Sequence, residues 1–196
     1  MANIMTNSFI NFLLRRRSVT AKKMLPTLVK EKDLSLIISS GIRVPDHGAL
    51  TPWRIVGFAG DSRFSFGEKI LAKTFLKLNP DATKEEIEYE KNRFTRAGVV
   101  LCVLSCPIEH KKIPLWEMQL SSGAVCNNLL SSAQSLGYAA QWLTEWYSYN
   151  DDILKALGGN SEKDSISGFI YIGRKNDEPT DRVRPNIEKV FSYWQV

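Results

Sequence analysis

The chain has 196 residues, of which 43% are hydrophobic, 10% aromatic and 24% charged, a composition typical of a globular protein and unlike that of disordered or fibrous chains. The net charge of +5 is concentrated at the start, because residues 1–32 hold seven basic residues and one acidic residue, whereas the rest of the chain has a net charge of −1. A near-neutral body argues against a general polyanion-binding protein, and the length predicts a single domain over residues 1–196.

The cysteines, histidines and apolar runs exclude several classes of protein. Three cysteines (Cys102, Cys106 and Cys126) are an odd and sparse set that argues against a disulfide framework, and two histidines make a His-rich zinc site hard to build. The longest apolar run, residues 97–104, is far shorter than the roughly 20 residues that cross a membrane. In residues 1–18 the charges follow the apolar stretch, whereas in a secretory signal they precede it. We therefore expect a cytoplasmic protein without a membrane segment or a metal site, with an amphipathic mitochondrial presequence as the alternative.

The apolar pattern predicts helices and strands that alternate irregularly along the chain. Helical spacing or helix-terminating residues predict helices at 6–14, 26–42, 62–78, 83–97, 114–136 and 150–157. Continuous or alternating apolar residues predict strands at 53–60, 98–105 and 166–173, with a further short strand and loop within 138–146. In the longest helix, residues 121–124 are all small, so another helix or a flat ligand can approach closely. We expect a three-layer α/β or α+β domain around one sheet.

Two segments in the first part of the chain carry candidate binding residues. Residues 15–18 (Arg-Arg-Arg-Ser) suit a phosphate group, because adjacent guanidinium groups can hold a dianion and the serine hydroxyl donates a further hydrogen bond. The alternative is a solvated basic patch that offsets the dipole of the preceding helix. The loop 43–53 brings Arg43, Asp46 and His47 together between two predicted elements, which is a common place for a site. A structural Asp–His pair is the alternative there.

Two later segments complete the candidates. Residues 141–146 (QWLTEW) follow the longest helix and combine backbone amides with aromatic bulk, and the alternative is an aromatic corner of the core. Residues 168–174 (GFIYIGR) predict a buried strand that ends in Gly173 and Arg174, where the backbone can approach a phosphate. The sequence contains no Gly-x-Gly-x-x-Gly, Walker or Gly-x-Ser-x-Gly motif, so a Rossmann fold, a P-loop protein and an α/β-hydrolase are unsupported.

In this order, the four segments resemble the nitroreductase family, and more closely its small single-domain bacterial branch of flavin-dependent NAD(P)H oxidoreductases. The resemblance rests on Arg16-Arg17-Ser18, on the loop RVPDHGALTPW before the first strand, on residues 116–144 and on the strand GFIYIG. It extends over essentially the whole chain. It implies a nitroreductase-like fold with a central mixed sheet flanked by helices, and a homodimer with FMN bound non-covalently between the subunits.

The resemblance also implies which residues bind and what reaction follows. The implied FMN-binding residues are Arg16, Arg17 and Ser18 at the phosphate and ribityl end, Gly173 and Arg174 near the phosphate, Trp142, Leu143 and Thr144 at the isoalloxazine ring, and Arg43 and His47 from the partner subunit. The residues implied to contact a nicotinamide nucleotide are Ser132, Ala133, Gln134, Ser135, Leu136 and Gly137. NADH or NADPH would give a hydride to the flavin, and a nitroaromatic, quinone-like or other electron-poor acceptor would then take the electrons in a ping-pong mechanism. No side chain is needed as a catalytic nucleophile, because the flavin carries the chemistry.

Leu143 is a departure from this branch, in which relatives tend to carry a basic residue at the flavin loop. The alternative is therefore a non-catalytic flavin-binding or storage protein. A role of the basic segment in nucleic-acid binding is another alternative, but the near-neutral body and the lack of a helix-turn-helix, zinc-finger or RNA-binding signature argue against it. A third alternative keeps the fold and changes the reaction, with a pocket lid expected within residues 62–97. We expect a small-molecule acceptor and a second copy of the chain as partners, and neither nucleic acid nor a membrane.

Overall fold

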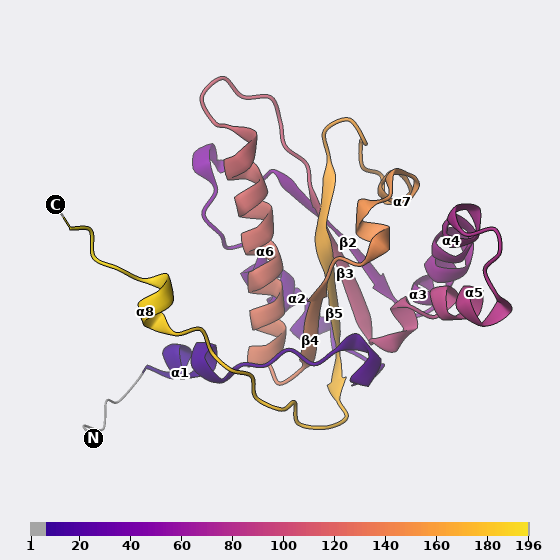
Figure 1. Ribbon diagram of the computed structural model, residues 1–196, viewed down its shortest axis with the longest axis horizontal. Helices are drawn as coiled ribbons and strands as arrows, with labels where there is room; N and C mark the ends of the chain where they lie inside the picture. Colours follow the sequence, from indigo (N-terminus) through magenta and orange to yellow (C-terminus); the bar gives the residue numbers. More distant parts are fainter. Residues whose placement is uncertain (1–6, 196) are drawn as a thin grey trace.

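The computed structural model describes residues 7–195, so the first residue of the helix expected at 6–14 lies outside the described part. Within it, one β-sheet lies between two layers of helices (Figure 1), which confirms the expected α+β architecture. None of the helices in residues 7–195 is both long enough and apolar enough to cross a membrane.

Antiparallel pairing joins all the strands of the described sheet. The strands are β1 (Met24–Leu25), β2 (Trp53–Ala59), β3 (Val99–Ser105), β4 (Ala139–Leu143) and β5 (Ser165–Lys175). Strand β2 pairs with β3, β3 pairs with β5, and β5 also pairs with β4 and β1. The expectation of a mixed sheet therefore does not hold within this single chain. An apolar pattern identifies a strand but contains no information on the direction of its neighbour.

Strand β3 is the centre of the sheet, and all seven of its residues are buried. Its side chains alternate between the two faces, as a pleated strand requires. Val100, Cys102 and Leu104 belong to the core on one side of the sheet, while Val99 and Leu101 belong to the core on the other. Burial on both faces explains why this segment reads as a continuous apolar run rather than an alternating one.

The two helical layers use different parts of the chain. One face of the sheet is covered by α2 (Glu31–Gly41) and α6 (Leu115–Ser135). The other face is covered by α3 (Ser62–Phe66), the π-helical turn η3 (Gly67–Leu71), the 3₁₀ turns η4 (Phe94–Arg96) and η5 (Trp146–Tyr149), and α7 (Asp151–Ala156). Helices α4 (Ala72–Leu78) and α5 (Lys84–Lys91) pack against η3 and project from the sheet (Figure 1). Phe94 is wholly buried in this layer and contacts the rings of Phe58, Phe169 and Tyr171.

Two predicted helices are shorter than expected. The helix predicted at 26–42 begins at Glu31, because residues before it are extended against the start of β3: a Cβ on Gly98 would lie only 1.8 Å from the carbonyl oxygen of Thr27. The helix predicted at 83–97 ends at Lys91, and a 3₁₀ turn then carries Phe94 into the core. The other predicted elements agree with the structure to within about two residues.

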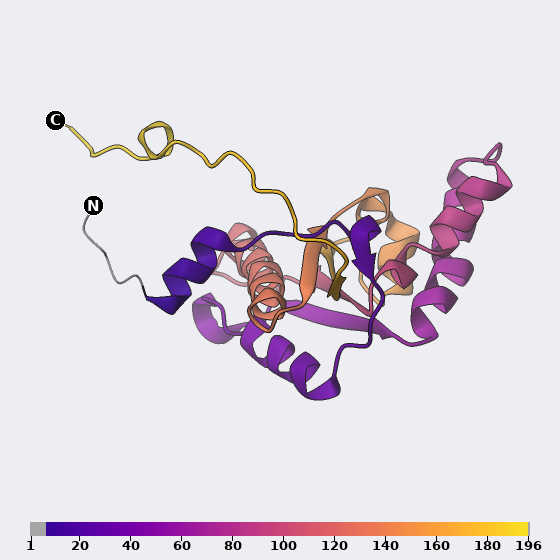
Figure 2. The same ribbon diagram turned by 90° about the horizontal axis from the view of Figure 1, so that it is seen from below.

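The first and last segments of the described residues lie on the same side of the molecule. Helix α1 (Ser8–Arg15) and the segment that follows β5, which contains α8 (Ile187–Val190), extend away from the sheet in similar directions (Figure 2). Both carry exposed apolar side chains, among them Phe9, Leu14, Tyr193 and Trp194. Helix α1 contributes no buried residue, so its apolar face is left uncovered in the single chain.

Candidate functional site

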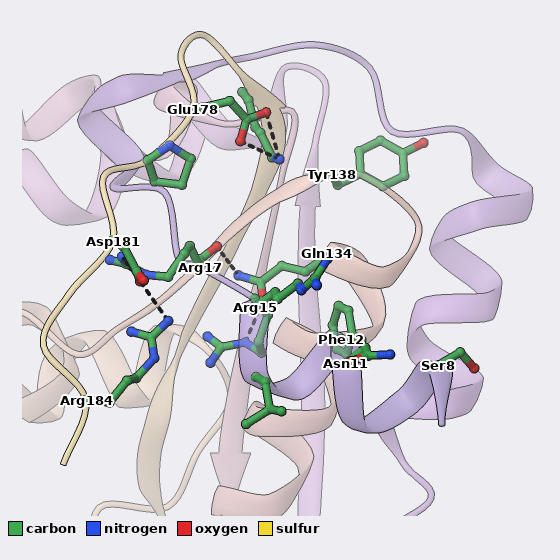
Figure 3. A pocket seen from close by; sticks show the side chains of 14 residues that line it. Ser8, Asn11, Phe12, Arg15, Arg17, Gln134, Tyr138, Glu178, Asp181 and Arg184 are labelled. Atoms are coloured by element: carbon green, nitrogen blue, oxygen red, sulfur yellow. Dashed lines mark hydrogen bonds and ion pairs between the residues drawn. The ribbon is translucent and has the colours of Figure 1, made fainter. Parts of the chain in front are cut away.

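The first candidate segment lies at the carboxyl end of the long helix α6. Helix α1 ends at Arg15, and Arg16 adopts a non-helical backbone conformation that turns the chain toward α6. The Arg16 Nε atom donates a hydrogen bond of 2.7 Å to Gln134 Oε1, and its Nη2 atom lies 3.2 Å from Ser18 Oγ. The Gln134 amide nitrogen in turn donates to the carbonyl oxygens of Arg17 and Ala140, at 3.0 and 3.2 Å. Gln134 of α6 lies beside the arginine segment (Figure 3) and also bonds to β4, so one side chain joins the three.

The residues after Ser18 continue along β4. The Val19 amide donates to the carbonyl oxygen of Ala140, and the Ala21 amide donates to the side-chain oxygen of Gln141. Both Val19 and Ala21 are buried. These contacts hold the backbone that presents the arginines.

The arginine segment lines a cavity of about 610 Å³ that is rich in positive charge. Five of its lining residues are basic: Arg15, Arg16, Arg17, Lys175 and Arg184. Two are acidic: Glu178 and Asp181. Burial, followed by the neighbouring charges of Arg17 and Arg184, lowers the pKa of the Arg16 guanidinium below its ordinary value. An anion placed among these groups would relieve that repulsion.

One acidic residue of the carboxyl-terminal segment partly neutralises the cavity. Asp181 Oδ1 lies 3.2 Å from Arg17 Nη1 and 2.8 Å from Arg184 Nη2, and Arg17 also donates to the carbonyl oxygen of Thr180. A hydrogen bond from the Arg182 amide, together with the charges of Arg184 and Arg17, lowers the pKa of Asp181. Asp181 is therefore a carboxylate at neutral pH and occupies part of the region in which an external anion would bind.

The predicted ring-binding residues lie at the opposite end of β4 from Gln134. Strand β4 begins at Ala139, beside the end of α6, and ends at Leu143, roughly 13 Å further along. Trp142 is 38% exposed, and its Nε1 atom donates to the carbonyl oxygen of Ser167 at 3.0 Å. Leu143 is half-buried, and Thr144 directly follows the strand. The arginine segment and the Trp142–Thr144 segment thus lie at the two ends of one strand, an arrangement that suits an elongated ligand with an anionic end.

Gly173 and Arg174 lie beside β1 rather than in the arginine cavity. Gly173 is buried, and a Cβ at this position would lie 2.7 Å from the carbonyl oxygen of Leu25. Arg174 is exposed and pairs through its backbone with Leu25. The next residue of β5, Lys175, is the one that lines the cavity. The ligand roles expected for Gly173 and Arg174 remain predictions.

His47 lies far from the arginine segment of the same chain, whereas Arg43 lies nearer to it. His47 Nδ1 is 2.7 Å from Glu117 Oε2, in the first turn of α6, whereas Gln134 lies in its last turn, roughly 25 Å along the helix. Arg43 is exposed, and its carbonyl oxygen accepts a hydrogen bond from Asn128. His47 therefore lies too far from Arg16 for both to contact one small ligand in a single chain, so its expected role requires a second subunit. The role expected for Arg43 from a partner subunit stays a prediction, because Arg43 lines a pocket with Phe12 of α1 and Ser135 of α6 in the same chain.

The alternative of a structural Asp–His pair in this loop is wrong. His47 pairs with Glu117, while Asp46 accepts a hydrogen bond of 2.8 Å from the backbone amide of Thr51. Sequence proximity suggested the pair, but the loop backbone turns the two side chains to different partners.

Residues 132–137 do not form one ligand-binding face. Ala133 is wholly buried in the core, which leaves it no surface for a nucleotide. Gln134 holds the arginine segment, and Ser132 Oγ accepts a hydrogen bond of 2.8 Å from Ser40 Oγ. Gly137 has a φ of +86° and ends the helix, a conformation that glycine adopts readily. A nicotinamide contact by the exposed members of this segment remains a prediction.

Sequence reasoning did not identify Lys175, Asp181 and Arg184 as cavity residues. The cavity requires the segment after β5 to return to α1, and this return has no local sequence signal. The one available indication was the basic pattern Arg182-Val183-Arg184, which resembles the charge pattern of the first segment.

Comparison with known proteins identifies the family. The sequence profile of the Nitroreductase family matches residues 13–174. The chain belongs to the nitroreductase family. A similar curated protein, "Putative NAD(P)H nitroreductase YdjA" of Escherichia coli (strain K12), is 26% identical over 164 residues, which cover 84% of this chain and 86% of that protein.

Solved structures of nitroreductases share the fold. A nitroreductase-like family protein from Bacillus cereus is 20% identical, with 98% of each chain covered and a TM-score of 0.76. A nitroreductase with bound FMN from Bacteroides fragilis NCTC 9343 is 17% identical, with 97% of this chain and 100% of that chain covered and a TM-score of 0.69. The nitroreductase fold therefore extends over nearly the whole chain.

Proposed function

We propose that this nitroreductase-family chain is an FMN-dependent oxidoreductase that takes a hydride from NADH or NADPH and reduces nitroaromatic, quinone-like or other electron-poor acceptors by a ping-pong mechanism. The observation that carries the proposal is the placement of Arg16, Arg17 and Ser18 at one end of β4 and of Trp142–Thr144 at the other. The NAD(P)H nitroreductase name of the Escherichia coli relative and the FMN bound to the Bacteroides fragilis protein support the choice of donor and cofactor.

The residues of the cavity fit the phosphate end of FMN. The guanidinium groups of Arg16 and Arg17 provide planar donors for phosphate oxygens, and basic residues outnumber acidic ones in the cavity lining. Ser18 Oγ is already within hydrogen-bond distance of Arg16, so a phosphate held there can also accept from this hydroxyl. Asp181 would compete with the phosphate for Arg17, because its carboxylate pairs with Arg17 and Arg184.

The Trp142–Thr144 segment fits the ring end. When bound, FMN supplies the two-electron redox chemistry. Trp142 offers an aromatic surface, and Leu143 provides apolar bulk that excludes water from the ring. The backbone amides at the end of β4 are available to orient the ring edge. Arg43 of the partner subunit would bring positive charge to the ring and favour the reduced cofactor.

A homodimer would complete this site, since His47, which is expected from the partner, lies a helix length away from the arginine segment in the single chain. An exposed face of α6 supports the dimer: Trp116 and Leu120 are 64% and 53% exposed and lie one turn apart. On the same helix, a Cβ at Gly123 would meet no atom within 4 Å. Apolar side chains beside such a gap form a surface that a second copy of the chain can cover.

The decisive experiment is the spectrum of the purified protein. We expect a yellow protein that releases FMN on denaturation and whose flavin absorbance is bleached anaerobically by NADH or NADPH. Arg16→Ala should lose FMN, while Lys69→Ala, an exposed change in the opposite helical layer, should retain it. A flavin that binds but stays oxidised with both nucleotides indicates the storage protein instead. A colourless chain that takes up no added FMN contradicts the proposal.

A further inference from the structure

Backbone strain in this structure is concentrated in the two loops singled out as flavin-binding. Within residues 7–195, the non-glycine residues with positive φ are Ala49, Thr51 and Glu145, with φ of +52°, +49° and +43°. The first two belong to the loop that carries Arg43 and His47. Glu145 directly follows Thr144. A side chain in this region of φ is unfavourable and persists only where the surrounding contacts hold it.

The contact that holds Glu145 is an ion pair with a buried arginine. The Glu145 carboxylate accepts a hydrogen bond from Nη1 of Arg93, whose residue is 7% exposed. The other guanidinium nitrogens of Arg93 bind the carboxylate of Glu90, which is 2% exposed, with Nη2 at 2.6 Å from Oε1. The indole of Trp146 donates to the second Glu90 oxygen at 3.1 Å. Two consecutive residues of the turn are thus anchored to α5 through one buried cluster.

The segment before Glu145 is anchored at its other end as well. The Trp142 indole donates to the carbonyl oxygen of Ser167, and a Cβ on Gly168 would lie 2.0 Å from this indole nitrogen. Leu143 and Thr144 therefore lie between two anchored residues. Trp142 is bonded to Ser167 of β5, and Glu145 is bonded to Arg93. The side chain of Ser148 closes the turn by donating to the carbonyl oxygen of Thr144.

We propose that Glu145 and Arg93 are a positioning pair that holds the turn after β4 in its strained conformation and so fixes how residues 142–144 meet the flavin ring. The expected effect on the flavin rests on the proposed function, whereas the Glu145–Arg93 pair itself needs no bound FMN. Glu145 acts through the backbone of its neighbours.

The charge arrangement shows which residue can be changed without unfolding the chain. Although burial opposes its charge, the hydrogen bonds and charge of Glu90, and then the charge of Glu145, raise the pKa of Arg93 above its ordinary value. Removal of Arg93 would leave the Glu90 carboxylate buried and unpaired, which is strongly destabilising. Removal of the Glu145 carboxylate leaves the Arg93–Glu90 pair intact, and the Glu145 side chain is 29% exposed. Substitutions at Glu145 are therefore the informative ones.

Three substitutions separate the effect of the Glu145–Arg93 ion pair from the effects of backbone strain and of charge. Glu145→Ala removes the ion pair, while positive φ stays unfavourable for alanine, so the turn should relax to another conformation. Glu145→Gln keeps a hydrogen-bond acceptor without the charge and should behave like the wild type. Glu145→Gly also removes the ion pair, but glycine adopts positive φ readily, so this variant should behave intermediately between Glu145→Ala and Glu145→Gln. Asp152→Asn, which breaks the exposed Lys77–Asp152 pair, is the matched control.

The first readout is made on the protein without flavin. Chymotrypsin cleaves after aromatic residues and leucine, and residues 142–147 offer several such sites. We expect cleavage within this turn to be about tenfold faster in Glu145→Ala than in the wild type, and unchanged in Glu145→Gln and Asp152→Asn. Equal cleavage rates in Glu145→Ala and the wild type would overturn the proposal, whether or not the protein binds FMN.

The second readout is the bound flavin. We expect Glu145→Ala to retain FMN, because the arginine cavity is untouched, but to shift the reduction potential and the visible spectrum of the flavin, with Glu145→Gln restoring both. A flavin with wild-type potential and spectrum in Glu145→Ala would also overturn the proposal. A wild-type chain that binds no FMN would contradict the proposed function. The chymotrypsin experiment would still test whether the Glu145–Arg93 pair holds the turn.

Discussion

Gln134 Oε1 lies 2.7 Å from Arg16 Nε, although 118 positions separate the two residues in the chain. The contact places the first guanidinium of the cavity against the last turn of α6. It gives the concentration of positive charge in residues 1–32 a specific meaning, since three of those charges (Arg15, Arg16 and Arg17) line one cavity. The cavity is therefore assembled by a side-chain amide rather than by the backbone of a glycine-rich loop.

Gln134→Leu should weaken both the fold and anion binding. Leucine has a similar size but leaves Arg16 Nε and the carbonyl oxygens of Arg17 and Ala140 without this partner, which costs about 1–3 kcal/mol of unfolding free energy. Urea unfolding measures the loss, and FMN titration should show weaker binding. Ser135→Ala, at an exposed neighbouring position, is the control and should change neither quantity. Equal FMN affinity in Gln134→Leu and the wild type would show that Gln134 does not organise the cavity.

Asp181→Asn should strengthen FMN binding. The substitution removes the carboxylate that pairs with Arg17 and Arg184 and so leaves their charge to the cofactor phosphate. Since exposed ion pairs are weak, we expect the FMN dissociation constant to fall by about twofold to fivefold. Fluorescence titration at low ionic strength measures it, with Asp81→Asn in the distant α4–α5 loop as the control. Weaker FMN binding in Asp181→Asn would mean that Asp181 helps to hold the arginines in place instead.

Leu120→Asp should prevent dimerisation. It places a charge on the exposed face of α6, which we propose is covered by a second copy of the chain. Leu78→Asp is a matched control, because Leu78 is 55% exposed against 53% for Leu120 and lies at the end of α4. Sedimentation velocity should show a dimer for the wild type and Leu78→Asp, and a monomer with less bound FMN for Leu120→Asp. A wild type that sediments as a monomer would remove the dimer from the proposal.

The buried strands and helices could be predicted from the sequence because their local pattern of apolar residues indicates burial. The run Val99–Ser105 and the helical spacing of α6 indicated β3 and the long helix directly. The start of α2 was missed because close packing between Gly98 and Thr27 keeps the preceding residues extended. Strand β1 was also missed, since its two residues are a strand only through their pairing with β5.

The site was predictable where residue type alone indicates chemistry. Adjacent arginines and a serine indicated a candidate phosphate site, and the structure places the arginines at a basic cavity; phosphate binding there stays a prediction. The role of Gln134 could not be read, because a glutamine near a helix end has no distinctive pattern and its partner is remote in sequence. The positive φ of Glu145 was equally hidden, since glycine is the residue that normally indicates such a conformation.

Alkaline pH should destabilise the protein through its buried thiols. Burial raises the pKa of the Cys126 thiol from 9.0 to about 12, so the native state keeps a proton that the unfolded chain releases. Between these values the unfolded state binds fewer protons, and the free energy of unfolding falls by up to about 1.4 kcal/mol per pH unit for this group. Urea unfolding between pH 9 and pH 11 should give a shallower decline in Cys126→Ala than in the wild type. Parallel declines would show that Cys126 does not contribute.

The double burial of β3 also sets the order in which the molecule opens. Every residue of this strand is buried, and it is paired with β2 on one side and β5 on the other. Each amide of β3 faces either β2 or β5, so exchange of the whole strand requires both neighbouring strands to separate, which we expect only on global unfolding. In native-state hydrogen exchange, β3 should therefore retain its protons longest and report the stability of the whole domain, while the amides of α1 exchange first.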